Sequence, residues 1–234
     1  MVDEKHQRCD CRLDLIPPLQ ASGSVAAGLL LLLLLLPAAI ARTDQTSLRL
    51  TFGSLSAWQE KSFKGHTSYT LVQSEGRAVI QAIAEGTASG LYHEISISAS
   101  ELPLITWSWK VQQTLAAENP YRKEGDDFAA RVYIVFPGAF FWQTRALVYV
   151  WSDKLPVGTI IPNAFTSNAA IIAIESGNRH AGVWRYERRN YVEDYRACFH
   201  EVPPNPVAVA VMTDTDNTGG QATAWYGDIL FSRK

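Results

Sequence analysis

The chain has 234 residues, of which 47% are hydrophobic and 19% are charged, and its formal net charge at pH 7 is −2. This composition excludes a disordered chain and provides enough apolar residues for the core of one domain. It also excludes nucleic acid as an expected partner, because no basic stretch is present that could neutralise a row of phosphates.

The N-terminal segment differs from the remainder of the chain. Val25–Ala41 is an uncharged, leucine-rich run that ends in a small-x-small pattern, Ala39-Ile40-Ala41, which signal peptidases accept. We therefore expect residues 1–41 to be a signal peptide and the protein to be exported to the bacterial periplasm. An uncleaved membrane anchor is the alternative. In either case this segment alone is expected to contact the membrane.

Residues 42–234 show little helical periodicity and many short β-rich runs between turn residues. Strands are expected at 48–52, 68–72, 77–83, 90–97, 104–111, 127–136, 145–151, 170–175, 183–189, 206–213 and 222–231. Their spacing predicts an all-β fold, a single antiparallel β-sandwich domain of jelly-roll type that covers 42–234. One short helix is expected over 190–199, where two tyrosines recur at helical spacing before a proline-rich segment.

Two of these strands indicate where the core lies. In the strand at 104–111 every second residue is large and apolar, Trp107 and Trp109 among them, so one face is expected to be buried. The strand at 127–136 is apolar on both faces beyond Arg131, which is typical of a central strand that is covered on both sides.

An acidic loop separates the last two strands, which we expect to pair as an antiparallel hairpin because they are consecutive and apolar. Asp214, Asp216 and Asn217 resemble the start of a calcium-binding loop. With Asp228 they form the candidate ligand set for a structural Ca²⁺, which prefers oxygen donors. The alternatives are a turn in which these side chains bond the backbone of the loop, and direct contact with a bound ligand.

Two adjacent carboxylates, Asp126 and Asp127, stand where the central strand is expected to begin. Because neighbouring residues in a strand face opposite sides, we do not expect both to serve one site. Asp127 and Arg131 share a face but lie about 13 Å apart along the strand, so each is expected to find its partner on another strand.

The partner expected for Asp127 is one of two adjacent arginines, Arg188 and Arg189, and the short helix adds Asp194. A structural network of ion pairs is the alternative to a binding site. The charged candidates for ligand binding are therefore Asp127, Arg131, Arg189, Asp194, Asp214 and Asp216.

Three aromatic residues, Phe140, Phe141 and Trp142, lie in the connection between two expected strands. An exposed aromatic platform at this position would stack on sugar rings or on a partner protein, so Phe141 and Trp142 are also candidates for ligand binding. The alternative is a loop whose aromatic side chains fold back over the edge of a sheet.

Known catalytic signatures are missing from the sequence. It contains no G-x-S-x-G motif and no glycine-rich phosphate loop, and the His93-Glu94 pair lacks the second histidine of a zinc protease. No catalytic residue is assigned for this reason.

Five stretches follow one another with the spacing of a known family: SWK (108–110), GDDFAARVYIVF (125–136), YVWS (149–152), RRNYVEDYR (188–196) and MTDTDNTGGQATAWYGDI (212–229). Through them the chain resembles the bacterial family of exported proteins named domain of unknown function 3047 (DUF3047). The end of the last stretch is also similar to the last strand of galactose-binding-like jelly rolls. That second resemblance implies sugar binding and a structural Ca²⁺, on likeness of fold alone.

The sequence thus favours a ligand-binding module for a saccharide or another component of the cell envelope. A second hypothesis is a hydrolase that acts on glycans through Asp127 and a second carboxylate such as Asp216. A third is a structural or assembly protein that uses the loop with Phe140–Trp142 against a partner.

Overall fold

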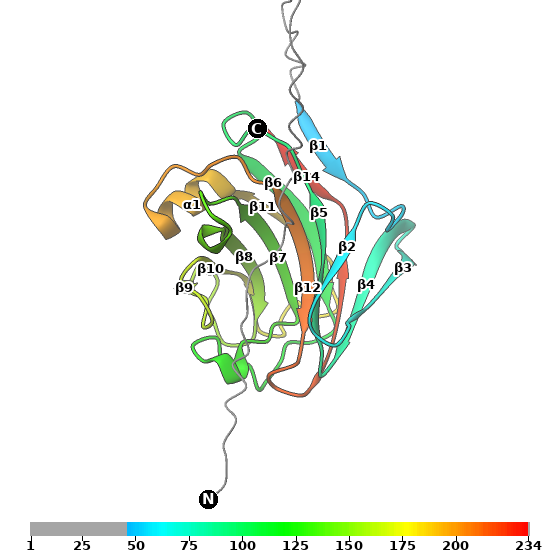
Figure 1. The fold of residues 1–234 in the computed structure, drawn as a ribbon. Coiled ribbons are helices and arrows are strands. Elements are labelled where there is room, and N and C mark those ends of the chain that lie inside the picture. Colours follow the sequence, from blue (N-terminus) through cyan, green and yellow to red (C-terminus); the bar gives the residue numbers. More distant parts are fainter. Residues whose placement is uncertain (1–45, 234) are drawn as a thin grey trace, which may run out of the picture.

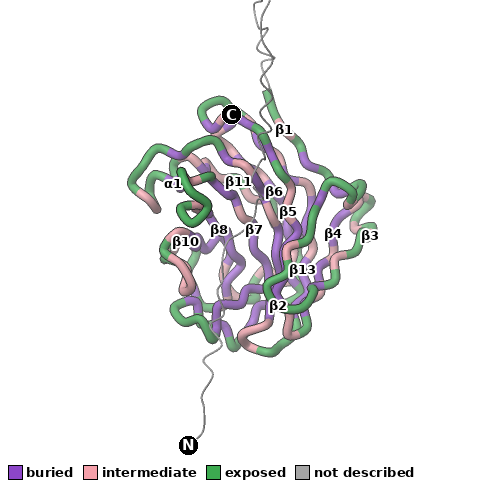
Figure 2. Tube along the Cα trace, viewed as in Figure 1, coloured by how far each residue is buried: buried purple, intermediate pink, exposed green. Residues whose placement is uncertain are grey.

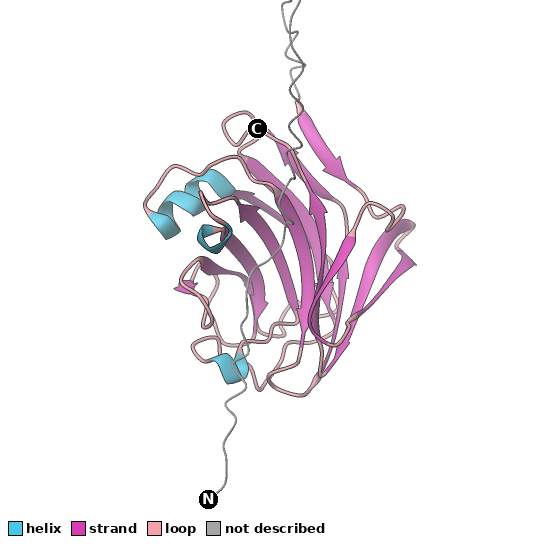
Figure 3. Ribbon diagram, in the orientation of Figure 1, coloured by secondary structure: helices cyan, strands magenta, loops and turns pink. Residues whose placement is uncertain are grey.

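The computed structural model describes residues 46–233, so the expected signal peptide at 1–41 lies outside the described residues. Two seven-stranded sheets pack face to face as a β-sandwich of jelly-roll type (Figures 1 and 3). Every strand pair is antiparallel except β8 and β10, which run parallel. The predicted all-β sandwich is confirmed.

Sheet 1 contains seven strands, β1 (Ser47–Leu50), β3 (Ser68–Ser74), β4 (Arg77–Glu85), β6 (Leu104–Val111), β11 (Arg185–Asn190), β13 (Gln221–Tyr226) and β14 (Ile229–Ser232). Their order is β1-β14-β6-β13-β4-β3, and β11 pairs with the other edge of β6. The single strand expected at 222–231 is divided into β13 and β14 by a break at Gly227 and Asp228. Both strands pair with β6, β13 before the break and β14 after it.

Sheet 2 contains the other seven strands, in the order β2 (Gln59–Lys64), β5 (Ala88–Glu94), β12 (Ala208–Asp214), β7 (Ala130–Phe136), β8 (Arg145–Ser152), β10 (Ala169–Ser176) and β9 (Ile160–Pro162). The edge strands β2 and β9 were not predicted. β2 has an almost entirely polar sequence and is largely exposed (Figure 2), and β9 has only three residues, which is too short for an alternation of apolar and polar residues to be recognised. The central position predicted for the strand at 127–136 is confirmed by β7.

The main core lies between the sheets, where β6 faces β8. Trp107 and Trp109 are 3% and 0% exposed, as the alternation in this strand predicts. Trp107 stacks on Tyr149 with ring centroids 5.0 Å apart, and Trp109 meets Trp151 at 5.9 Å. A smaller apolar cluster, which includes Phe128 and residues of β8 and β10, lies on the outer face of sheet 2.

The predicted helix is confirmed as α1 (Tyr191–Phe199), which packs at the periphery of the sandwich (Figure 3). It begins after Asn190, whose side-chain oxygen accepts hydrogen bonds from the backbone N–H groups of Val192 and Glu193, both at 3.2 Å. Two 3₁₀ turns, η1 (Lys123–Gly125) and η2 (Phe141–Gln143), complete the regular structure. Among residues 46–233 there is no helix with the length and apolarity needed to cross a membrane.

Candidate functional site

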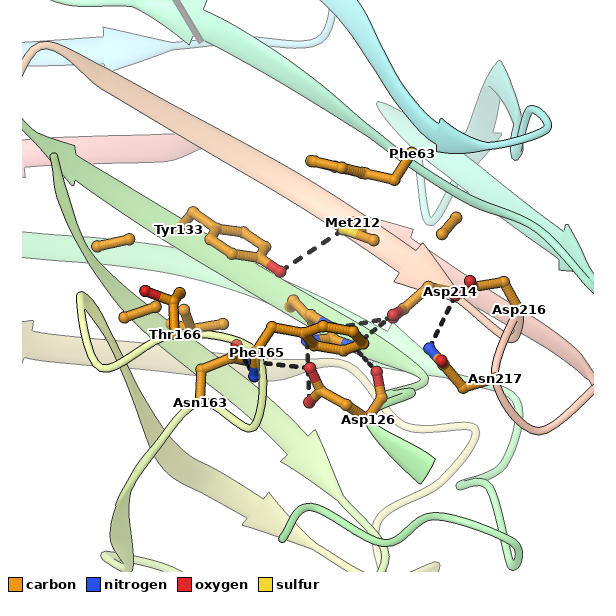
Figure 4. A pocket seen from close by; sticks show the side chains of 15 residues that line it. Phe63, Asp126, Tyr133, Asn163, Phe165, Thr166, Met212, Asp214, Asp216 and Asn217 are labelled. Atoms are coloured by element: carbon orange, nitrogen blue, oxygen red, sulfur yellow. Dashed lines mark hydrogen bonds and ion pairs between the residues drawn. The ribbon is translucent and has the colours of Figure 1, made fainter. Parts of the chain in front are cut away.

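A pocket of about 130 Å³ opens on the outer face of sheet 2 (Figure 4). Strands β2, β5, β12, β7, β8 and β10 contribute to it, together with the connections that precede β7 and follow β9. One wall is apolar and aromatic and includes Phe63, Tyr133 and Met212, and the opposite part is polar and includes Asp126 and Asp216. The pocket therefore joins an apolar surface to a group of carboxylates.

The centre of the polar part is an ion pair between Arg131 of β7 and Asp214 of β12. Nε of Arg131 donates to Oδ1 of Asp214 at 2.8 Å, and Nη2 donates to Oδ2, which makes the pair bidentate. Both side chains are 3% exposed. Arg131 also donates to the backbone carbonyl of Asp126, and its guanidinium lies 4.5 Å from the ring centroid of Phe128. These contacts fix the guanidinium on all sides.

Asp127 holds the acidic loop in place. Its Oδ2 accepts hydrogen bonds from the backbone N–H groups of Asn217 at 3.1 Å and Thr218 at 2.6 Å, and its Oδ1 accepts from Nδ2 of Asn217 at 3.1 Å. Asp127 is completely buried. Lys64 of β2 also contacts this loop, because its Nζ donates a hydrogen bond to the backbone carbonyl of Asp216 at 2.7 Å. The loop is thus a structural turn that Asp127 organises.

Negative charge exceeds positive charge in this region. Four carboxylates, those of residues 126, 127, 214 and 216, surround one guanidinium and one ammonium group. Burial raises the pKa of Asp126 and of Asp216, and it raises the pKa of Asp214 to about 8 although Arg131 opposes this shift. Asp126, Asp214 and Asp216 consequently retain their protons at a higher pH than isolated carboxylates do.

Two predictions about this region were wrong. The strands on either side of the acidic loop do not form a hairpin: β12 pairs with β5 and β7 in sheet 2, and β13 pairs with β4 and β6 in sheet 1. The loop therefore crosses between the sheets. Asp126 and Asp127 do reach the same cluster, because β7 begins only at Ala130 and the alternation of a strand does not apply to them.

The predicted partner of Asp127 was also wrong. Asp127 is bonded to the acidic loop, whereas Arg189 forms an ion pair with Asp194, with Nε donating to Oδ2 at 3.0 Å. The hydroxyl of Tyr149 donates to the same oxygen of Asp194 at 2.8 Å. This second pair attaches α1 to the core and lies apart from the pocket.

The calcium donors proposed from the sequence do not fit a bound cation well. Oxygens of Asp127, Asp214 and Asp216 lie within 4.8 Å of one another. However, both oxygens of Asp214 already accept hydrogen bonds from Arg131, which is positive and would repel a cation. Asp228 lies on the other sheet, where its Oδ2 is 3.2 Å from Nη1 of Arg49. The region is better described as a cluster of carboxylates that is partly neutralised by Arg131.

The aromatic loop is exposed. Phe141 and Trp142 are 54% and 58% exposed, and Phe140 stacks on Trp142 with ring centroids 4.7 Å apart and the planes inclined by 3°. The alternative of a loop folded back over a sheet edge is therefore wrong. This loop follows β7 whereas Asp126 precedes it, so the two sites lie at opposite ends of the strand.

Several pocket residues could not be identified from the sequence. Phe63 lies on the unpredicted strand β2, and Asn163 and Phe165 lie in the connection after β9. Tyr133 and Met212 were expected only as strand residues. Their apolar pattern identifies strands but not which outer face stays uncovered.

Solved structures with similar folds include domains that are named for carbohydrate binding. The family 11 carbohydrate-binding module of the cellulosomal cellulase Lic26A-Cel5E of Clostridium thermocellum is 11% identical, with a TM-score of 0.43, covering 80% of this chain and 95% of that one. The xylan-binding module CBM15 is 11% identical, with a TM-score of 0.37 and coverages of 80% and 95%.

A third similar structure is the K3 cleaved adhesin domain of Lys-gingipain from Porphyromonas gingivalis. It is 15% identical, with a TM-score of 0.40, and the alignment covers 79% of this chain and 98% of that domain. These likenesses concern the fold only.

No curated protein matches the chain in sequence. The sequence model of one family, described as "Protein of unknown function (DUF3047)", matches residues 56–230. This match covers most of the chain, including all five stretches on which the resemblance was based, and the protein therefore belongs to the DUF3047 family.

Proposed function

We propose that the protein is an exported ligand-binding module that takes one end of a saccharide in the pocket on the outer face of sheet 2. The observation that carries the proposal is that one pocket combines apolar and aromatic side chains with carboxylate and amide groups held by hydrogen bonds. Sugar rings have apolar faces and hydroxyl-bearing edges, and this combination offers a partner to each.

The apolar wall extends beyond the pocket. A smaller hollow of about 40 Å³ shares Phe63, Tyr133 and Met212 with it, and reaches Gly90 and Tyr92 on β5. A side chain at Gly90 would contact Met212, since a Cβ built there lies 3.6 Å from the Cβ of that residue. The absence of a side chain at Gly90 therefore leaves space above β5 and β12. The two hollows together form a shallow groove across β2, β5, β12 and β7.

The polar part has unused capacity for hydrogen bonds. Oδ1 of Asp126 is buried and has no hydrogen-bond donor among the described residues, although Nη1 of Arg131 is 3.6 Å away. A ligand hydroxyl would supply that donor. Asn163, whose Nδ2 donates to the other oxygen of Asp126 at 2.7 Å, holds the carboxylate in place.

The size of the pocket favours a chain end over a long stretch of polymer. Its volume of about 130 Å³ is below the range of roughly 300–1,000 Å³ typical of sites that enclose drug-sized ligands. One ring would enter and the following part of the ligand would lie along the shallow groove.

The geometry favours binding without turnover. A hydrolase that used Asp127 would need this carboxylate to reach the substrate, yet Asp127 is completely buried and bonded to Asn217 and Thr218. The hydrolase hypothesis therefore receives no support from the residue on which it was based.

A glycan array followed by calorimetry tests the proposal. Phe63→Ala removes an aromatic side chain that is 45% exposed on an edge strand, so the fold is expected to persist while affinity falls about tenfold, or about 1.4 kcal/mol. Leu71→Ala, which truncates a side chain 42% exposed on sheet 1, is the matched control. Equal affinity in both variants would contradict the assignment, as would an array without any bound glycan.

Export is a separate part of the proposal and has its own test. Cell fractionation of the full chain and of a version lacking residues 1–41 is expected to place only the full chain in the periplasm. Recovery of both versions in the cytoplasm would refute export and leave the pocket unaffected.

A further inference from the structure

A separate hollow, of about 480 Å³, lies on the outer face of sheet 1. Register places Arg49, Leu230, Thr106 and Arg188 in one row across β1, β14, β6 and β11. Because directly opposed residues of antiparallel strands share a face, this row brings two arginines to opposite sides of the hollow. Both arginines line it.

The third arginine of the hollow is Arg77. Its guanidinium is oriented by neighbouring side chains, but one of its nitrogens lacks a hydrogen-bond acceptor among the described residues. Its Cζ lies 4.5 Å from the ring centroid of Trp184 and 5.2 Å from that of Tyr186, so two aromatic rings orient it. Nη1 donates to Oγ of Ser108 at 3.4 Å. Nη2 is buried and has no acceptor among the described residues. A buried donor without an acceptor is costly, so this nitrogen offers a strong position for an anion.

The carboxylates near the hollow already bond to other side chains of the protein. Asp228 is paired with Arg49 at 3.2 Å, and Oε1 of Glu187 accepts from the indole nitrogen of Trp109 at 3.2 Å. Arg188 is exposed and has no ion pair within residues 46–233. Two arginines, Arg77 and Arg188, thus remain available to a ligand.

The break between β13 and β14 keeps space beside Arg77. A Cβ on Gly227 would lie 2.3 Å from Oγ of Ser108 and 3.6 Å from Nη1 of Arg77. Any larger residue would therefore displace the serine that bonds Arg77. Glycine at this position preserves the floor of the hollow.

We propose that this hollow is an anion-binding site, in which Arg77 and Arg188 bind a carboxylate or phosphate group and the exposed ring of Tyr186 covers the attached part of the ligand. Guanidinium groups recognise both anions through paired N–H donors. Tyr186 is 67% exposed, so much of its ring surface remains accessible to a ligand although the ring also contacts Arg77. The site lies on the sheet opposite the saccharide pocket and does not depend on it.

Titrations followed by NMR, at constant ionic strength, distinguish the two anions. The probes are glucuronate for a carboxylate, glucose 6-phosphate and inorganic phosphate for a phosphate, and methyl glucoside as the neutral control. We expect at least one anion to bind the parent and to bind Arg188→Gln about tenfold more weakly, which corresponds to about 1.4 kcal/mol. Arg196→Gln is the control, since Arg196 is exposed on α1 and does not line the hollow.

Arg77→Lys sharpens the test because it keeps the charge and removes the planar pair of donors. Arg77→Lys is expected to lower the affinity for the anion by at least as much as Arg188→Gln does. An unchanged thermal unfolding transition checks that the variant is folded. If no anion binds the parent, or if Arg188→Gln and Arg196→Gln bind equally, the proposal is overturned. Phe63→Ala is expected to leave the anion titration unchanged, so failure of the saccharide site is distinguishable from failure of this one.

Discussion

The outer faces of the two sheets both carry arginines, but in opposite electrostatic situations. On sheet 2, Arg131 is 3% exposed and bonded to Asp214 and to the carbonyl of Asp126, so its charge is used within the protein. On sheet 1, considering the described residues 46–233, Arg77 has a buried nitrogen without an acceptor and Arg188 has no ion pair. The comparison teaches that the presence of charge alone does not identify a binding site; unsatisfied bonding capacity is the more informative observation.

The largest expected effect follows from breaking the buried pair of sheet 2. At pH 9, above the pKa of Asp214, Arg131→Met leaves the ionised carboxylate of Asp214 without a counter-charge, so the free energy of unfolding is expected to fall by about 3–5 kcal/mol. Urea denaturation measures this change. Arg188→Gln is expected to alter stability by no more than about 0.5 kcal/mol, as for other surface substitutions. If both variants lost a similar free energy of unfolding, Arg131 and Arg188 would not differ in their role in stability, and the contrast between the two sheets would be wrong.

A smaller effect is expected from the hydroxyl that connects the sheets beneath the pocket. Tyr226 of β13 donates to the carbonyl of Met212 at 2.6 Å and accepts from the backbone N–H of Arg131 at 3.3 Å. Tyr226→Phe leaves these buried groups without their partner and is expected to cost about 1–3 kcal/mol. Thermal unfolding checks the loss, and an unchanged melting temperature would show that water replaces the hydroxyl.

The pH dependence of stability separates the two faces further. Burial raises the pKa of Asp214 to about 8, so the folded state retains a proton that the unfolded state releases near pH 4. This contribution to stability is complete below about pH 4 and is lost as the pH rises through 8. The pKa of Asp216 is also raised by burial. Asp216→Asn removes this second titrating carboxylate, so the stability of the variant is expected to fall less than that of the parent as the pH rises.

Melting temperatures from pH 4 to pH 9 test this expectation. Asp228→Asn is the matched control, because Asp228 is paired with Arg49 on sheet 1, outside the acidic cluster. A profile of Asp216→Asn that coincides with the parent would show that the cluster does not titrate as a unit.

The smallest expected effect is that of calcium. Because Arg131 occupies the oxygens of Asp214, neither EDTA nor added Ca²⁺ is expected to shift thermal unfolding of the parent. A bound ion would stabilise the fold by about 2.7 kcal/mol at a hundredfold excess over Kd. A shift of that size, abolished in Asp216→Asn, would establish the calcium site that the sequence suggested.

Much of the fold follows from local patterns in the sequence. Alternation identifies the buried face of β6, and a continuous apolar run identifies β7 as central. The spacing of two tyrosines and the proline-rich segment that follows identify α1. These features are local because side-chain periodicity directly reports which face is buried.

The candidate sites depend on contacts that no local pattern encodes. Arg131 and Asp214 are 83 residues apart in the chain, and the choice between a hairpin and a crossing loop is decided by tertiary packing of β12 and β13 in different sheets. The outer hollow of sheet 1 depends on a break of two residues within one apolar run. The sequence analysis identified the charged groups of the acidic cluster but could not pair them, since pairing requires the register of distant strands. It did not single out Arg77, which becomes a candidate only through its neighbours in the folded chain.

The position of the last two strands has a consequence for synthesis of the protein. β13 and β14 lie inside sheet 1, where β13 separates β6 from β4 and β14 separates β6 from β1. Until β13 and β14 have been synthesised and have paired, β1, β4 and β6 each have an unpaired edge, and the sheet cannot close around Trp107 and Trp109. Closure of sheet 1 is therefore a late step, because its first strand, β1, finds its partner only when β14 is present.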